Sequence, residues 1–352
     1  MPRRFRPAVA VALALAGFLA FAWSLGKPLP IPPSASVQHN YGLALENAHD
    51  GRPGAARLLY QQLTRTDLAP EQQVALLVEL PNFPSTQALK LASAKLQSDA
   101  PAVRHAAIDC LRTLVPAAQR SLLLGPLLSD GDQAIRWHAT RALLDLSPDQ
   151  LGLYYAELEK TLDAYARVLE EQPDAPDALL QLARLYLRDQ DYAKADTTLQ
   201  RLRTIQPDNP ALIPLRMQVF EGQHLPDQAR EVLAEPLRRD PQSALLQTEL
   251  GHWLLRHGAP EYALLALTRA VELAPDNPDY RYDLAVALHG LDQLQAAQHQ
   301  LDELLRRDPA NRRARVLLIQ YWKESGQLQN VQVLLAELEQ QNPDDPVVQA
   351  GF

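Results

Sequence analysis

The sequence is short of the residues that build most chemical sites. It contains one cysteine, Cys110, among 352 residues, and only 14 glycines. One thiol cannot form an intramolecular disulfide, a cysteine zinc site or a CxxCH haem attachment. No GxSxG, P-loop, GxGxxG or HExxH pattern occurs. These absences predict a chain that is not an enzyme and that has no cofactor or metal of its own.

An excess of positive charge is also missing. The chain has 34 basic and 42 acidic residues, a formal net charge of −8, and both signs are mixed along its length. Nucleic-acid binding would require a basic face, so this class of partner is not expected. Alanine, leucine, glutamine, arginine and glutamate are abundant and favour helices. The 28 prolines contradict that picture until their positions are considered.

The longest uncharged run lies near the N-terminus. Arg3, Arg4 and Arg6 precede residues 8–25, which carry no charge. As a helix, this run reaches about 27 Å and just spans a hydrocarbon core of roughly 30 Å. The basic side favours the cytoplasm. We therefore expect a single-pass anchor in residues 1–25, inserted in a bacterial inner membrane, a Pro-rich linker in residues 26–38, and the remainder in the periplasm.

The alternative is a secretory signal that is removed. Ala20-Phe21-Ala22 resembles a cleavage site, and Arg3-Arg4 suggests a twin-arginine signal, although the residues that follow fit that signal poorly. Each of these interpretations exports the rest of the chain.

Prolines recur every 34 residues in the second half of the chain, at Pro173, Pro207, Pro241, Pro275, Pro309 and Pro343. Proline cannot continue a helix, so a fixed period of stops indicates one repeated supersecondary unit. Each unit holds two amphipathic stretches. Positions are counted from the first residues of the units, which are Pro176, Pro210, Ala244, Pro278 and Arg312. Small residues recur at the twentieth position (Ala195, Ala229, Ala263, Ala297), and the twenty-fourth position is always leucine (Leu199, Leu233, Leu267, Leu301, Leu335).

This pattern resembles the tetratricopeptide repeat family over about residues 156–345. The resemblance implies helical hairpins stacked into a solenoid. One departure is Pro236, which falls in a second helix where the family prefers alanine. A proline inside a straight helix costs roughly 3 kcal/mol. We expect this helix to be kinked or shortened and the unit of residues 210–243 to be the weakest.

Residues 39–150 lack the 34-residue stops but contain another repeat. Residues 98–111 and 130–143 share an acidic turn followed by Val-Arg or Ile-Arg and a face of small residues. This resembles HEAT-like repeats, and residues 41–80 are expected to add two or three helices. The predicted fold is therefore all-α, an α-solenoid of HEAT-like repeats (39–150) and a tetratricopeptide array (151–352), forming one continuous curved rod.

The order of these segments also resembles the C-terminal half of some exported multihaem cytochromes. Because the haem-binding motifs are absent, no redox role follows.

The candidate site is the concave groove. In the tetratricopeptide family, the first helix of each hairpin lines this surface. Polar residues at the corresponding positions here are Arg184, Arg188, Gln218, Glu221, Thr248, His252, Arg256, Tyr282, His289, Gln320 and Lys323. Guanidinium groups among them could bind carboxylates in bidentate pairs. Trp137 and His138 are interpreted as packing at the junction of the two arrays, and Cys110 as a small buried residue.

These features predict a non-catalytic scaffold or adaptor. It would be tethered through residues 8–25 and would bind partner proteins or peptides in the groove. An assembly or folding chaperone for exported proteins or envelope complexes is one alternative. A non-catalytic subunit of an enzyme complex is another. Neither nucleic acid nor a small-molecule substrate is expected as a partner.

Overall fold

The computed structural model describes residues 35–350, and within that range every regular element is helical. The chain divides into a short unit, residues 1–43, and a large unit, residues 44–352, with α2 (Ala35–His49) crossing the boundary. The predicted anchor, residues 8–25, lies outside the described residues. None of the helices in residues 35–350 is both long and apolar enough to cross a bilayer.

The first half of the large unit alternates helices with short 3-10 turns. These elements are α3 (Ala55–Leu63), α4 (Pro70–Glu79), η1 (Leu80–Asn82), α5 (Thr86–Lys95), α6 (Pro101–Leu114), α7 (Ala117–Leu124), η2 (Gly125–Ser129), α8 (Gln133–Leu143), α9 (Pro148–Leu151), η3 (Gly152–Tyr154) and α10 (Tyr155–Glu170). Three helices, α2 to α4, cover the segment where two or three were expected.

Helices α6 and α8 correspond to the two segments that recur at a spacing of 32 residues in the sequence. The shared arginines explain the motif. Arg104 donates to the carbonyl of Ser98 at 2.8 Å, and Arg136 donates to the carbonyl of Asp130 at 2.6 Å. Each arginine therefore ties its helix to the turn six residues earlier. The internal repeat is real in the structure, while its assignment to the HEAT-like class stays a prediction.

The second half of the large unit consists of helical hairpins. Their helices are α11 (Pro176–Arg188), α12 (Tyr192–Ile205), α13 (Leu212–Gly222), α14 (Pro226–Arg239), α15 (Ala244–Arg256), α16 (Pro260–Leu273), α17 (Pro278–His289), α18 (Leu294–Arg307), α19 (Arg312–Glu324), α20 (Leu328–Gln341) and the short α21 (Pro346–Gln349). The recurring prolines fall in the loops between hairpins, as the sequence predicted.

The small and leucine positions of the repeat form the core of each hairpin. Ala195, Ala263 and Leu267 are fully buried. A Cβ atom added at Gly251 would lie 2.5 Å from Cγ of Leu267. The helices α15 and α16 can approach this closely because Gly251 has no side chain.

The unit of residues 210–243 is packed less densely than its neighbours. Its core cluster contains three buried residues, Met217, Leu233 and Leu246, between larger clusters on either side. Pro236 does not shorten α14, which has 14 residues like α12 and α16. Instead, Pro236 lines a cavity of about 670 Å³. The sparse core agrees with the expectation that this is the weakest unit. Of the two expected effects of Pro236, the helix is not shortened, and a kink stays a prediction.

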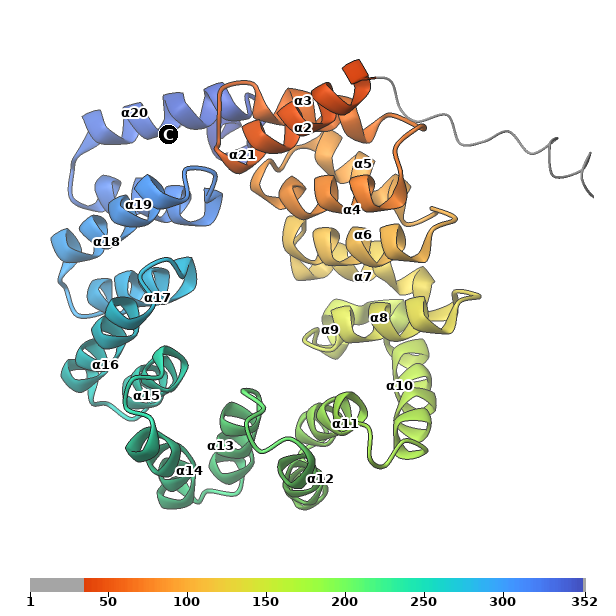
Figure 1. The fold of residues 1–352 in the computed structure, drawn as a ribbon, viewed down its shortest axis with the longest axis vertical. Helices are drawn as coiled ribbons and strands as arrows, with labels where there is room; N and C mark the ends of the chain where they lie inside the picture. Colours follow the sequence, from red (N-terminus) through yellow and green to blue (C-terminus); the bar gives the residue numbers. More distant parts are fainter. Residues whose placement is uncertain (1–34, 351–352) are drawn as a thin grey trace, which may run out of the picture. The chain divides into compact units, whose positions relative to one another are not determined.

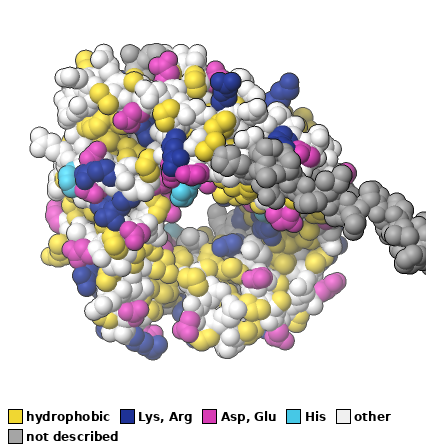
Figure 2. Space-filling view, turned by 45° about the horizontal axis from the view of Figure 1, so that its top comes forward, with side chains coloured by type: hydrophobic (Ala, Val, Ile, Leu, Met, Phe, Trp, Pro, Cys, Tyr) yellow, Lys and Arg dark blue, Asp and Glu magenta, His cyan; other side chains and the backbone are white. Residues whose placement is uncertain are grey.

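The large unit is a closed ring: the expected continuous curved rod bends until its two ends meet, which the sequence did not predict (Figure 1). The amide of Gly54 donates to the carbonyl of Gln340 at 2.7 Å, and Nδ2 of Asn342 donates to the carbonyl of Pro84 at 2.8 Å. We call this contact between residues 51–85 and 309–342 the seam. A space-filling view shows the open space that the ring surrounds (Figure 2).

Candidate binding surface on the inner wall

The first helix of each hairpin faces the inside of the ring. Helices α11, α13, α15, α17 and α19 lie on the inner side, and α12, α14, α16, α18 and α20 lie outside them (Figure 1). Helices α6 and α8 share a cavity with α11. We call the surface carried by these seven helices the inner wall. The sequence-predicted groove residues all belong to inner-wall helices.

Four of the predicted groove residues pair with acidic side chains of neighbouring helices, and three of them lie on α11 and α15. Arg188 forms an ion pair with Glu159 of α10. Arg256 contacts Glu221 at 3.3 Å, and His252 lies 3.0 Å from Asp283. These pairs link α11 to α10, α15 to α13 and α15 to α17. These basic side chains of the wall therefore hold successive repeats together, and their charge is already paired with a carboxylate.

The C-terminal part of the wall is braced in the same way. Nε2 of His289 lies 2.6 Å from Glu324, and its ring stacks on Tyr321 with centroids 4.1 Å apart. Gln320 donates to Glu324 at 3.1 Å. The guanidinium of Arg313 lies 3.6 Å from the ring centroid of Tyr282, which is a cation–π contact.

The remaining predicted residues divide into three cases. Thr248 is 5% exposed and donates its hydroxyl to the carbonyl of Ala244, so it presents no group to a partner, contrary to expectation. Gln218 and Arg184 are exposed side chains with no hydrogen bond or ion pair to the described residues. Lys323 lies on α19, on the same wall.

The pairing changes the acidity of several wall residues. The hydrogen bond to Asp283 raises the pKa of His252 above its usual value, against the effect of burial. The hydrogen bond from His289 lowers the pKa of Glu324. Burial raises the pKa of Glu249, whose neighbours His252 and Arg256 oppose that effect. The contact between α15 and α17 at Asp283 therefore favours the protonated form of His252.

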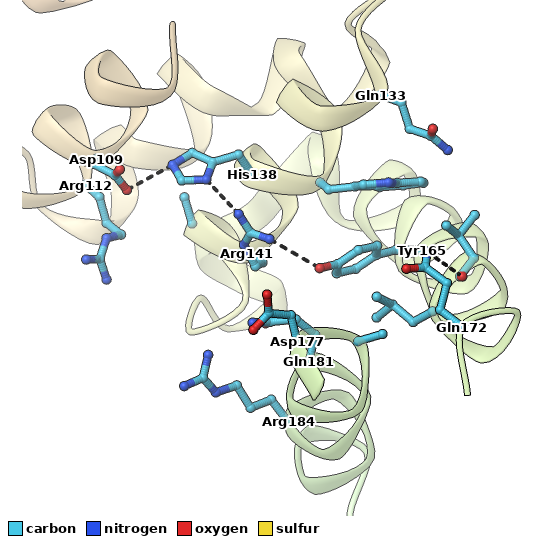
Figure 3. A pocket seen from close by; sticks show the side chains of 15 residues that line it. Asp109, Arg112, Gln133, His138, Arg141, Tyr165, Gln172, Asp177, Gln181 and Arg184 are labelled. Carbon is cyan, nitrogen blue, oxygen red and sulfur yellow. Dashed lines mark hydrogen bonds and ion pairs between the residues drawn. The ribbon is translucent and has the colours of Figure 1, made fainter. Parts of the chain in front are cut away.

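A cavity of about 790 Å³ opens where α6, α8, α10 and α11 meet (Figure 3). We call it the junction pocket. Its apolar side includes Trp137 stacked on Tyr165, with ring centroids 4.8 Å apart and an interplanar angle of 27°. Val168 and Leu169 of α10 extend this apolar side. Its polar side contains Arg112, Arg141 and Arg184, one from each of α6, α8 and α11.

His138 connects two elements of the junction pocket. Arg141 donates to Nδ1 of His138 at 2.8 Å, and Nε2 of His138 lies 3.0 Å from Oδ1 of Asp109. A guanidinium can only donate, so Nδ1 is an acceptor and Nε2 carries the proton. Burial alone would raise the pKa of Asp109, but the hydrogen bond from His138 and nearby positive charges lower it overall.

The sequence analysis missed most of this pocket. It placed Trp137 and His138 at the junction, where they do pack, but it did not expect them to line a cavity. Arg112, Arg141 and Asp177 had not been singled out. The available signal was that residues 109 and 141 are separated by the same 32-residue spacing as the two upstream repeats, so equivalent positions on α6 and α8 lie side by side.

The residues considered for other chemistry do not form a site within the described part of the chain. No group of three or more histidine, cysteine, aspartate or glutamate side chains in residues 35–350 is arranged to hold a metal ion. Cys110 is 3% exposed, and burial raises the pKa of its thiol to about 12. This burial confirms the interpretation of Cys110 as a small packed residue.

The described residues thus define an all-helical repeat protein of the solenoid class. Two family models, both described as tetratricopeptide repeat, match the chain, one at residues 156–219 and 254–313 and the other at residues 218–278. The chain therefore contains tetratricopeptide repeats, as the proline spacing predicted. Both matches lie downstream of the segment that resembles HEAT-like repeats.

Several solved structures are similar to part of this chain, and YrrB and TTC0263 among them are described as tetratricopeptide proteins. YrrB, described as having an unusual peptide-binding site, is 18% identical, with 53% of this chain and 96% of YrrB covered and a TM-score of 0.36. TTC0263 of Thermus thermophilus is 23% identical, with 58% of this chain and 98% of TTC0263 covered and a TM-score of 0.39. PilW, a type IV pilus biogenesis factor, is 21% identical, with 47% of this chain and 77% of PilW covered and a TM-score of 0.38. None of the curated proteins compared matches the chain.

Proposed function

We propose that this chain is a non-catalytic scaffold that binds a partner protein or peptide on the inner wall of its ring. Tetratricopeptide repeats generally mediate protein–protein interactions, and solenoids present extended concave surfaces for this purpose. The proposal includes a membrane tether in residues 8–25, with the ring on the periplasmic side. A reporter enzyme that is active only after export should be active when fused after Asn40 and inactive when fused after Arg6.

One observation carries the binding proposal. The inner wall is braced by its own cross-repeat pairs, such as Arg256 with Glu221 and His289 with Glu324, yet it retains an open cavity at the junction. A wall that is already braced loses little conformational entropy when a partner binds. The cavity lies within the usual size range of ligand sites, about 300–1,000 Å³.

Site-specific photo-cross-linking in intact cells tests this proposal. A photoreactive residue at Gln218, which is exposed on α13, should capture a discrete set of partners. The matched control is Tyr262, which is 67% exposed on the outer helix α16. Capture from Tyr262 but not from Gln218 would place the partner on the outside of the ring and would refute the proposal.

A further inference from the structure

The junction pocket differs in its charge pairing from the part of the inner wall that braces successive repeats. Elsewhere, Arg188, Arg256, His252 and His289 each contact a carboxylate on a neighbouring helix. A guanidinium that already pairs with a carboxylate has its charge partly neutralised, so it attracts a further carboxylate less strongly. Basic groups without acidic partners are therefore the informative ones on this wall.

Three such groups line the junction pocket. Arg112 and Arg184 have no hydrogen bond or ion pair to the described residues. Arg141 donates only to neutral acceptors, the Nδ1 atom of His138 at 2.8 Å and the hydroxyl of Tyr165 at 3.3 Å. All three are exposed, and they come from three different inner-wall helices. Figure 3 shows their side chains around the same cavity.

The acidic residues of the pocket neutralise these arginines only in part, since Asp109 interacts with Arg112 through charge alone. Asp109 accepts a hydrogen bond from His138, and Asp177 has no ion pair within the described residues. Three arginines against two aspartates leave the lining with a net positive charge, whereas the whole chain carries −8. A local positive surface attracts anionic segments of a partner.

The other side of the pocket is apolar and aromatic. Tyr165 is 3% exposed and holds Trp137 in a stacked position, and Val168 and Leu169 continue the same surface. A fixed aromatic pair offers contact area to an apolar or aromatic side chain at little entropic cost. A volume of about 790 Å³ accommodates several residues of a peptide, which exceeds the needs of a single inorganic anion.

We infer that the junction pocket binds an acidic segment of a partner protein, one in which carboxylates alternate with apolar or aromatic side chains. The carboxylates pair with the guanidinium groups of Arg112, Arg141 and Arg184, and an apolar side chain lies against Trp137 and Tyr165. This inference rests on the proposed function and names the chemistry of the segment. Asp109 and Asp177 oppose such a ligand by their charge, and Asp177 is the one of the two without a hydrogen bond or ion pair in the described residues.

The test measures peptide binding to the full chain by fluorescence anisotropy. The probe is a labelled peptide in which glutamate alternates with leucine and phenylalanine, and the matched peptide replaces each glutamate with glutamine. Arg184→Gln should weaken binding of the acidic peptide about tenfold, because a charge-assisted hydrogen bond is lost. Asp177→Asn should strengthen binding about twofold to fivefold, because a like charge is removed.

Arg201→Gln is the matched control. Arg201 is an exposed arginine on the outer helix α12, where it pairs with Asp174 at 2.7 Å, and its replacement should leave the dissociation constant unchanged. Far-ultraviolet circular dichroism of each variant verifies that the helices remain folded. Opposite effects of Arg184→Gln and Asp177→Asn cannot arise from a general loss of folding.

Several outcomes would overturn the inference. Equal binding of the glutamine peptide would show that charge does not select the ligand. Competition by inorganic phosphate as effective as that by the unlabelled acidic peptide would indicate a small-anion site. If cross-linking at Gln218 captures a partner whose capture is unaffected by Arg184→Gln, the scaffold function stands and the acidic-segment inference fails. If neither Gln218 nor the peptide assay detects a partner, both proposals fail.

Discussion

Closure of the ring can be tested at one glycine. Gly51 has φ of +60°, and a Cβ atom added there would lie 2.8 Å from the carbonyl oxygen of Pro309 and 3.0 Å from the amide nitrogen of Ala310. Both are backbone atoms, so no flexible side chain can move aside. Gly51→Ala therefore requires the two sides of the seam to separate.

The magnitude follows from what holds the seam. Two short hydrogen bonds cross it, from Gly54 to Gln340 at 2.7 Å and from Asn342 to Pro84 at 2.8 Å. Each contributes about 0.5–1.5 kcal/mol net, so together they hold the seam by about 1–3 kcal/mol. Overpacking of a close contact costs about 1–3 kcal/mol. The two quantities are similar, so the alanine variant should populate an open form substantially.

Gly54→Ala provides the control for backbone strain. Gly54 has φ of +76° but open space where its Cβ atom would lie. Both alanine variants incur the left-handed penalty of about 1–2 kcal/mol, and only Gly51→Ala creates the clash. The difference between them isolates closure of the ring from local strain.

Small-angle scattering and a distance probe measure the result. Spin labels at Gln61 and Asp344, which are exposed and line a cavity at the seam, should report one short distance in the parent protein. Gly51→Ala should add a population at long distance and increase the radius of gyration, and Gly54→Ala should do neither. Identical distance distributions in the two variants would refute the assignment of the seam.

Two further predictions concern the hairpins. Leu267→Ala should lower the free energy of unfolding by about 2–5 kcal/mol, because this leucine is fully buried against Gly251; chemical denaturation with a midpoint equal to the parent's would contradict it. The raised pKa of His252 means that its contact with Asp283 stabilises the fold fully below about pH 6.5 and is lost as the pH rises through the folded-state pKa. The melting temperature of the parent should therefore approach that of His252→Gln between about pH 6 and pH 8, and a constant difference across this range would be inconsistent with the assignment.

The hairpins were predictable because the residues that define each hairpin lie close together in the sequence. Proline stops and small residues at fixed positions define each hairpin without reference to distant residues. Helices α11, α15, α17 and α19 begin at Pro176, Ala244, Pro278 and Arg312, the first residues of the repeats in the sequence. Helix α13 begins at Leu212, two residues after Pro210, in the unit with the sparsest core.

The candidate site was only partly predictable. The sequence placed the right helices on the inner wall, but it treated Arg188 and Arg256 as free to bind a guest. Each arginine is separated in sequence from its acidic partner by about one repeat, as Arg256 is from Glu221. The two charges therefore meet only when the repeats stack. Opposite charges recurring 35 residues apart, also seen for His289 and Glu324, were the signal that could have revealed this bracing.

Closure of the ring could not be read from any local pattern. Tyr60 and Asn342, whose side chains meet at the seam, are 282 residues apart in sequence. Whether a solenoid closes depends on the sum of the small rotations between successive repeats. A slight change in each rotation therefore converts an open arc into a closed ring. The repeat pattern therefore specifies stacking and leaves the total curvature undetermined.

The polar residues at the seam indicate how the two ends of the helical array are shielded from water. A solenoid requires polar terminal repeats, because its end faces would otherwise expose core residues. Here the ends cover each other through buried polar groups. Asn342 is 1% exposed and Asp345 is fully buried, and Asp345 accepts two hydrogen bonds from Arg312, at 2.6 and 2.9 Å. If the ring opened, water would replace the hydrogen-bond partners of these polar groups. The seam can therefore join the two ends of the array without exposing an apolar face when it opens.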